Sequence, residues 1–234
     1  MRRLLGILAA ALGVAFVVAP GWIAGIGADS LDARGLADPF RTAFRAWWQR
    51  GDRALTPELE GIVDYWFRYH LAKGAIAALL LVVLVLLGLR LGRWAAALVP
   101  VGLVAIAAVM ANVQGAVAPF ASLFPLLSID DLRAPAAVMR AGDRPPTLVA
   151  MIDDYTLYHA VMIGVAGVVT VVFAGVAVVL GRRWARSSSN RWWFGSFGIL
   201  AALLSVAALV VTIANTTTTL NPEPGLLGFF EGSW

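Results

Sequence analysis

Residues 71–89 read LAKGAIAALLLVVLVLLGL, an apolar run whose single charged side chain, Lys73, lies near its start. An α-helix needs about 20 apolar residues to cross a hydrocarbon core of about 30 Å. Because every backbone N–H and C=O group inside a bilayer needs a partner within the protein, such a run predicts a helix. The stretch therefore predicts a transmembrane helix, with Lys73 close enough to its end to reach the polar interface.

Four further runs have the same character and contain no charged side chain: residues 4–27, 94–113, 159–181 and 194–215. The chain of 234 residues is 60% hydrophobic and only 14% charged, and its mean hydropathy is +0.82. A soluble domain of this size has no core large enough to bury so much apolar surface. We predict an all-α integral membrane protein with five transmembrane helices and a lipid bilayer as its surroundings.

The placement of arginine predicts the orientation of these spans. One side would hold eight arginines and no acidic residue: Arg2, Arg3, Arg90, Arg93, Arg182, Arg183, Arg186 and Arg191. The other side would hold ten basic and all 14 acidic residues, so that +8 − 4 gives the formal net charge of +4. Because arginine-rich loops stay in the cytoplasm, we predict a cytoplasmic N-terminus, with the large loops and the C-terminus outside.

The excess of arginine that gives the basic pI of about 10.1 is explained by this topology. The basic residues form no patch with interleaved aromatic residues, so we expect no nucleic-acid partner. The composition, rich in Ala, Val, Leu, Gly and Arg, is typical of a GC-rich bacterial genome. We therefore expect a multi-pass protein of the bacterial cytoplasmic (inner) membrane.

The two predicted outer loops, residues 28–70 and 114–158, contain helix signals. Asp38 followed by Pro39 predicts a helix start. After it, Phe40, Phe44, Trp47 and Trp48 share one side of an amphipathic helix, which we expect on the outer leaflet or against a partner. Thr56 and Pro57 predict the start of a second helix that continues into the second span.

The second loop repeats the first in order. GDRALT (51–56) matches GDRPPT (142–147), and Asp64 with Tyr69-His70 matches Asp153 with Tyr158-His159. The offsets are 142 − 51 = 91 and 159 − 70 = 89, so two residues separate the anchors. We predict a tandem parallel repeat of a helix–outer loop–helix unit, over residues 1–91 and 92–183, with a fifth helix and an outer tail in 184–234.

His70 and His159 are the only histidines in the chain, and the repeat places them at equal depth near the outer boundary. One interpretation is structural, with His70 hydrogen-bonded near Asn112 and His159 near Asn215. A second is that the two imidazoles bind a haem b as axial ligands. A nonhaem metal site is not expected, because Asp64 and His70 are six residues apart, about 9 Å and 240° around a helix.

The function that this pattern favours is that of a non-catalytic integral membrane subunit or accessory protein. It would dock other membrane protein subunits through its spans and its ordered outer loops, because no catalytic motif occurs in the sequence. The candidate contacts for a partner or ligand are Trp47, Trp48, Tyr69, Tyr158, Asp64 and Asp153. The alternatives are the haem binder and a small-molecule transporter, although no ionisable side chain lies at the midplane of a span.

Overall fold

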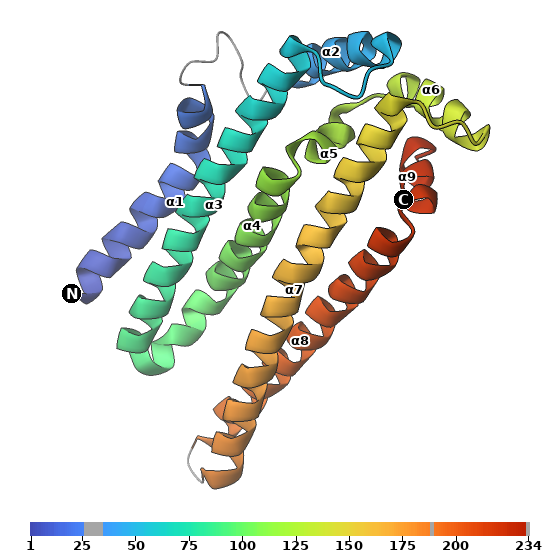
Figure 1. Ribbon diagram of the computed structural model, residues 1–234. Helices are drawn as coiled ribbons and strands as arrows, with labels where there is room; N and C mark the ends of the chain where they lie inside the picture. Colours follow the sequence, from blue (N-terminus) through green and yellow to red (C-terminus); the bar gives the residue numbers. More distant parts are fainter. Residues whose placement is uncertain (26–34, 188–189, 233–234) are drawn as a thin grey trace. The chain divides into compact units, whose positions relative to one another are not determined.

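The computed structural model describes residues 1–25, 35–187 and 190–232, and within them every regular element is a helix. The prediction of an all-α chain is confirmed for these residues. The chain divides into two compact units, Met1–Tyr158 with Glu223–Trp234, and His159–Pro222. Figure 1 shows α1, α3 and α4 side by side in the first unit and the α7–α8 hairpin of the second.

Five helices among the described residues are long and apolar enough to cross a membrane, as the sequence predicts. They are α1 (Arg2–Ala24), α3 (Pro57–Leu91), α4 (Val99–Val117), α7 (Pro146–Arg186) and α8 (Arg191–Leu220). The 3₁₀ helix η1 (Gly92–Leu98) joins α3 to α4, and the third candidate span, which contains α4, begins within η1 at Trp94. Residues 26–27, the predicted end of the first span, lie outside the described residues.

Helices α3 and α7 are longer than a bilayer requires. Thr56 caps α3, its hydroxyl accepting a hydrogen bond from the Leu59 N–H at 3.4 Å, and Pro57 occupies the first position as predicted. The 35 residues of α3 extend about 52 Å, and the 41 residues of α7 about 62 Å, at 1.5 Å per residue. Each helix therefore continues well beyond its apolar part, and α7 begins at Pro146, inside the predicted second loop.

The polar segments of the first unit fold into a compact structure that we call the cap. It consists of the first turns of α3 and α7 together with α2 (Ala37–Arg50), α5 (Pro119–Leu123), η2 (Phe124–Leu126), α6 (Ile129–Arg140) and α9 (Pro222–Phe230). The largest fully buried side chains of the chain are in its core, among them Phe40, Phe44, Trp47, Tyr65, Phe124 and Phe230. Since Leu226 and Phe230 are buried there, the C-terminal segment is an integral part of the cap.

The start of α2 differs from the prediction. The helix begins at Ala37 with Leu36 as its N-cap, and no side chain caps it, so the predicted cap at Asp38 is wrong. Leu36 is only 1% exposed, and its burial in the cap core accompanies a helix start two residues earlier than predicted. Asp38 lies instead in the first turn, where its negative charge interacts favourably with the positive end of the helix dipole. Its carboxylate lies 3.6 Å from the Arg41 guanidinium.

The amphipathic character of α2 is confirmed, but its apolar face packs within the chain itself. Phe40 and Trp47 are 0% exposed, and the ring of Trp47 contacts that of Phe120 edge-on, with centroids 5.3 Å apart. The face that we expected on a membrane or a partner thus forms the cap core. Burying one such aromatic side chain stabilises the cap by about 1.5–3 kcal/mol.

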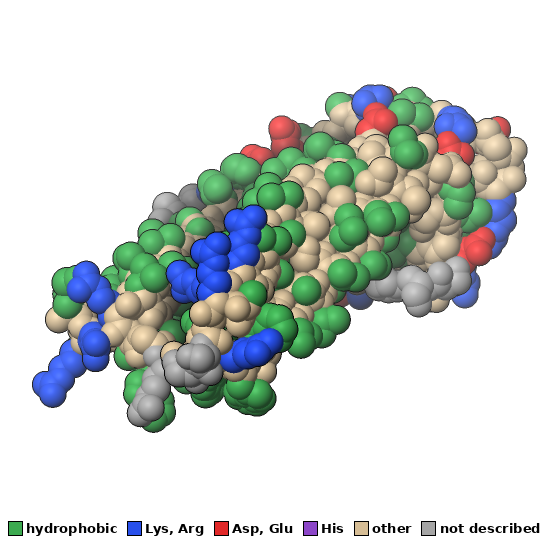
Figure 2. All heavy atoms as spheres, turned by 90° about the horizontal axis from the view of Figure 1, so that it is seen from below, with side chains coloured by type: hydrophobic (Ala, Val, Ile, Leu, Met, Phe, Trp, Pro, Cys, Tyr) green, Lys and Arg blue, Asp and Glu red, His purple; other side chains and the backbone are tan. Residues whose placement is uncertain are grey.

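The spans, unlike the cap, bury little of their own surface. Only 6% of the most apolar 18-residue stretch is buried in α1, in α7 and in the span Trp94–Val117, against 11% in α8 and 28% in α3. Helix α3 has the largest share because it packs against both α1 and α4. Figure 2 shows hydrophobic side chains spread over the surface of the spans. Such exposed apolar surface suits a lipid bilayer.

Candidate functional site: two histidine–asparagine pairs and the cap

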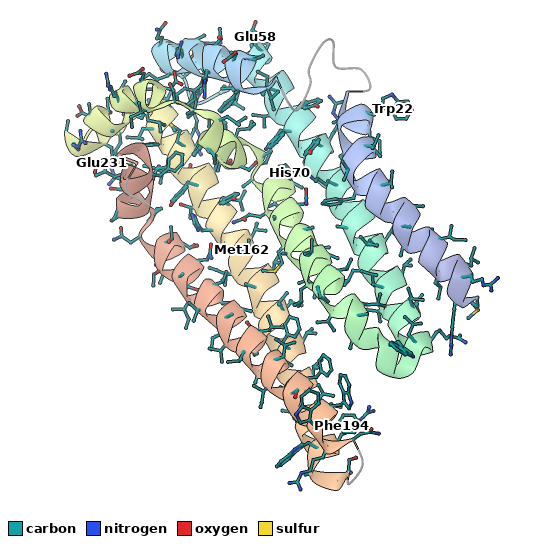
Figure 3. All side chains as sticks on the ribbon, turned by 180° about the vertical axis from the view of Figure 1, so that it is seen from behind. Trp22, Glu58, His70, Met162, Phe194 and Glu231 are labelled. Atoms are coloured by element: carbon teal, nitrogen blue, oxygen red, sulfur yellow. The ribbon has the colours of Figure 1, made fainter. Side chains whose placement is uncertain are left out.

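His70 lies where α3 crosses α4, close to the cap (Figure 3). Its Nδ1 atom lies 2.9 Å from Oδ1 of Asn112 on α4. Asn112 is only 5% exposed, and its side-chain amide donates a 2.7 Å hydrogen bond to the backbone carbonyl of Ala108. The sequence-based expectation that His70 bonds Asn112 is confirmed.

These two contacts fix the tautomer of His70. Since the Asn112 NH₂ group is used by Ala108, its Oδ1 atom is the group that faces the imidazole and can only accept a hydrogen bond. The His70 Nδ1 atom must therefore carry the proton and donate it, which leaves Nε2 as the atom with a lone pair in the neutral ring. Nε2 is buried and has no hydrogen-bond partner among the described residues.

Small residues allow this close crossing of α3 and α4. A Cβ atom added to Gly115 would lie 2.7 Å from Cε1, Nδ1 and Nε2 of His70, a distance that real Cβ atoms do not show. A Cβ added to Gly74 would lie 3.3 Å from the Cβ of Asn112. The imidazole ring thus lies flat on the backbone of α4 at Gly115, and the glycine is required there.

His159 makes the same kind of contact in the second unit. Its Nδ1 atom lies 2.7 Å from Oδ1 of Asn215 on α8, and the Asn215 amide donates to the carbonyl of Val211 at 2.8 Å. The predicted contact with Asn215 is also confirmed. In both hairpins a histidine therefore donates to an asparagine on the next helix, and that asparagine is held by a carbonyl four residues before it. We call this arrangement the His–Asn clasp.

The clasp does not leave room for a haem iron at His70. An axial ligand must present Nε2 to an open position, and here Nε2 has no accessible surface while the ring is packed on Gly115. Trp66 also packs edge-on against the imidazole, with ring centroids 4.7 Å apart. Among the described residues no group of three or more His, Cys, Asp or Glu side chains is arranged to bind a metal ion.

Tyr69 belongs to a small aromatic and cationic group beside the clasp. Its ring stacks on Trp66 at 5.1 Å, and its hydroxyl accepts a 3.0 Å hydrogen bond from Lys73. The Lys73 ammonium also lies 5.0 Å from the ring centroids of Phe16 on α1 and of Tyr69. The only charge in the apolar run of α3 is therefore held by aromatic faces, which attract cations.

The other candidate contact residues are distributed over the cap. Trp47 is fully buried and donates from Nε1 to the carbonyl of Ala54 at 3.1 Å, so it has no surface to offer a partner. Trp48 is half-buried and stacks on Phe44 at 6.4 Å. The backbone carbonyl of Tyr158 accepts a 2.9 Å hydrogen bond from Gln114.

The two matching aspartates have different surroundings. Asp153 forms a 2.6 Å ion pair with Arg53 of the first GDR segment, and its side chain is 54% exposed. Asp64 is exposed on α3.

Two acidic residues with clear structural roles were not singled out from the sequence. Asp154 accepts a 2.6 Å hydrogen bond from the Ala121 N–H, which anchors the short helix α5 to α7. Asp131 has a side chain with 0% exposure, and it bonds Ser128 and Arg45. The S-x-x-D pattern at Ser128 is the signal that could have identified Asp131, because it forms a capping box at the start of α6.

The environment of Asp131 shifts its acidity. Burial alone raises the pKa of this carboxyl, but the hydrogen bonds from Ser128 and the attraction of the Arg45 guanidinium outweigh burial, and the net pKa is lowered. Arg41 lies 3.8 Å away on the same face of α2. Asp131 is thus a buried carboxylate that joins α6 to α2.

No family model, curated protein or solved structure matches this chain. The arrangement of its own residues is therefore the basis for interpreting the function.

Proposed function

We propose that this chain is a non-catalytic integral membrane subunit or accessory protein that docks other membrane proteins through its spans and the rim of its cap. The supporting observation is the contrast in burial between the cap and the spans. The cap has a closed aromatic core, whereas at most 11% of the apolar stretch is buried in four of the five spans. Helices with so little internal contact have most of their apolar surface available for lipid or for other helices.

The same surface argues for packing by other helices as well as by lipid. Gly6 and Gly13 of α1 have no neighbouring atom within 4 Å of an added Cβ, and the same holds for Gly164 and Gly167 of α7. Small residues at helix surfaces allow the backbones of neighbouring membrane helices to approach closely. These positions are the ones at which a docked helix would gain most from close contact.

We further propose a cytoplasmic N-terminus in a bacterial inner membrane, with the cap outside. Support comes from charge: residues 182–191, where α7 ends and α8 begins, hold four arginines and no acidic residue, and all 14 acidic residues of the sequence lie outside the apolar runs. Arginine-rich connections remain cytoplasmic during insertion. The partners are then reached in the bilayer and from the outer side.

Duplication of a helix–outer loop–helix unit, over residues 1–91 and 92–183, remains our proposal. Three features support it. Gly51 and Gly142 of the GDR segments both have left-handed backbone angles, with φ of 76° and 80°. Both long helices, α3 and α7, begin at a proline shortly after. Each unit also contributes one histidine, His70 or His159, that forms a clasp with an asparagine on the helix after the unit.

The proposal is tested by the composition of the particle extracted in a mild detergent from its native membrane. Native mass spectrometry is expected to give a mass above 24.8 kDa that includes a second membrane protein. The control is the same chain expressed in a heterologous membrane, where that companion is absent. A stable monomer from the native membrane would contradict the docking proposal.

The haem alternative is tested by a visible absorption spectrum. The closed Nε2 position of His70 leads us to expect no Soret band in protein produced with haem supplied. A Soret band that is lost in both His70→Ala and His159→Ala would establish a haem site instead. For the transporter alternative, the apolar runs of the described spans contain no ionisable side chain at their midplane.

A further inference from the structure

A second cluster of polar side chains lies at the end of the α7–α8 hairpin, far along both helices from the His159–Asn215 clasp. A pocket of about 300 Å³ is lined there by Arg182, Arg183, Arg186, Ser187 and Phe194. All five residues belong to the unit His159–Pro222. Figure 3 labels Phe194 at this end of the hairpin. Three guanidinium groups, a hydroxyl and an aromatic ring therefore line one open depression.

The arginines of this pocket have no counter-charge. Residues 159–222 contain no Asp or Glu at all. In the part of the chain that the structure describes, Arg182, Arg183 and Arg186 form no ion pair or hydrogen bond with another residue. Seven arginines of the cap and its connecting loops, in contrast, each form an ion pair with a carboxylate.

The first turn of α8 adds to the positive potential of the pocket. Phe194 lies in that turn, and the N-cap residue Asn190 makes no side-chain hydrogen bond to the free N–H groups of the helix start. The N-terminus of a helix has a partial positive charge and favours anions. The 30-residue helix α8 therefore acts in the same direction as the three guanidinium groups.

Exposed aromatic residues surround this end of the hairpin. Trp192 and Trp193 are 72% and 47% exposed, and Trp184 is 41% exposed with Arg191 stacked 4.2 Å above its ring. Exposed tryptophans at the end of an apolar span are typical of the membrane–water interface. These tryptophans support a place for the pocket at the bilayer surface, where phosphate groups are concentrated.

We propose that this pocket binds a phosphate-bearing anion, supplied by the headgroup of an anionic phospholipid rather than by free phosphate. The guanidinium groups of Arg182, Arg183 and Arg186 bind the phosphate oxygens, which they can contact in bidentate fashion. Phe194 packs against the glycerol and upper acyl carbons. Basic pockets between transmembrane helices are suited to such headgroups.

The test measures lipid retention in the purified full chain. The protein is exchanged into nanodiscs of phosphatidylcholine with one fifth phosphatidylglycerol, and the lipid retained after extraction into detergent is counted by native mass spectrometry. We expect phosphatidylglycerol to be retained preferentially. Each Arg→Gln change in the pocket should weaken retention about fivefold, as expected for one arginine at an anionic surface.

Matched variants separate a pocket from general charge attraction. The triple variant Arg182→Gln, Arg183→Gln, Arg186→Gln is compared with Arg2→Gln, Arg3→Gln, Arg90→Gln, which removes equal charge from arginines outside the pocket. Phe194→Ala leaves the charge unchanged and serves if the triple variant inserts poorly. The proposal predicts a large loss of retained phosphatidylglycerol for the pocket triple, a smaller loss for Phe194→Ala and little change for the control triple.

Three results would overturn the proposal. Equal losses for the two triple variants would show attraction by overall charge, and equal retention of phosphatidylcholine would show that the phosphate anion is not selected. Displacement of phosphatidylglycerol by millimolar inorganic phosphate would assign the pocket to a soluble phosphate compound instead of a lipid.

Discussion

Asn112 accepts a hydrogen bond from His70 across the α3–α4 crossing, at 2.9 Å, and is itself fixed by the carbonyl of Ala108. The hydrogen bond places the proton of the neutral imidazole on Nδ1 and connects α3 to the following helix, α4. It explains the occurrence of a polar pair in an apolar hairpin, because the pair joins two helices that gain little from hydrophobic contact in a bilayer.

Replacing Asn112 with alanine should destabilise the first hairpin. The change leaves the buried Nδ1–H group of His70 without an acceptor, which costs about 1–3 kcal/mol of unfolding free energy. Unfolding in mixed detergent micelles measures this cost. Asn215→Ala should cost less, about 0.5–1.5 kcal/mol, because Asn215 is more exposed. The exposed Asn221 provides the control, since Asn221→Ala should change stability by less than about 0.5 kcal/mol. Equal effects at positions 112 and 221 would show that the clasp does not stabilise the hairpin.

Gly115→Ala tests the contact between the imidazole and the backbone of α4. The added methyl group would lie 2.7 Å from three atoms of the His70 ring, so we expect a loss of about 1–3 kcal/mol of unfolding free energy. Combining it with His70→Ala should remove the clash, so the double variant should be more stable than the sum of the single changes predicts. Gly102→Ala on the same helix meets no atom within 4 Å and should be neutral or stabilising. A Gly115→Ala protein as stable as Gly102→Ala would show that the ring does not lie on this glycine.

The lowered pKa of Asp131 leads us to expect that the cap loses stability in acid. Because its folded pKa is lowered, this carboxylate contributes stability that is complete above its unfolded pKa, about 3.9. That contribution is lost as pH falls below this value and through the lower folded pKa. The near-ultraviolet circular dichroism of the cap tryptophans should therefore show unfolding in this acidic range, and Asp131→Asn should be less stable at neutral pH and less sensitive to acid. The control is Asp130→Asn, whose side chain is 71% exposed. Identical acid titrations for the wild type and Asp131→Asn would exclude this role.

The sequence predicts the spans better than the cap, for a physical reason. Membrane helices are fixed by local composition and length, so residues 71–89 alone predict one of them. The His–Asn pairs were also predictable, because histidines and asparagines are rare polar residues at similar depth in neighbouring apolar runs. The cap depends on contacts between segments distant in the chain. The direction of the α2 apolar face and the docking of α9 are decided by Phe120, Phe124 and Phe230, which no local pattern connects.

The buried acids were equally hard to predict. The repeat drew attention to Asp153, whereas its neighbour Asp154 anchors α5. Two adjacent carboxylates on a helix point about 100° apart, so one residue of shift decides which of them faces a neighbouring segment. Only the three-dimensional position of Ala121 distinguishes the two.

Cysteine labelling tests the proposed orientation, and the chain contains no natural cysteine to interfere. Glu58→Cys places a thiol at an exposed position of the cap, and Ser187→Cys places one at the α7–α8 end. With a cytoplasmic N-terminus, a membrane-impermeant maleimide should label Glu58→Cys in intact cells and Ser187→Cys only after permeabilisation. Labelling in the reverse order would show the opposite orientation.

The docking proposal is tested most directly by photo-crosslinking in the native membrane. A photoreactive amino acid is placed at Leu203, Val206 or Val210, which share one face of α8 and are 63%, 59% and 60% exposed, and at Val14 or Val17 of α1. Ala208, only 8% exposed, serves as the control on the buried face of α8. We predict a discrete adduct with one other membrane protein that follows the helical period on one of these faces and is absent at Ala208. Adducts with lipid alone at every exposed position would contradict a docking subunit.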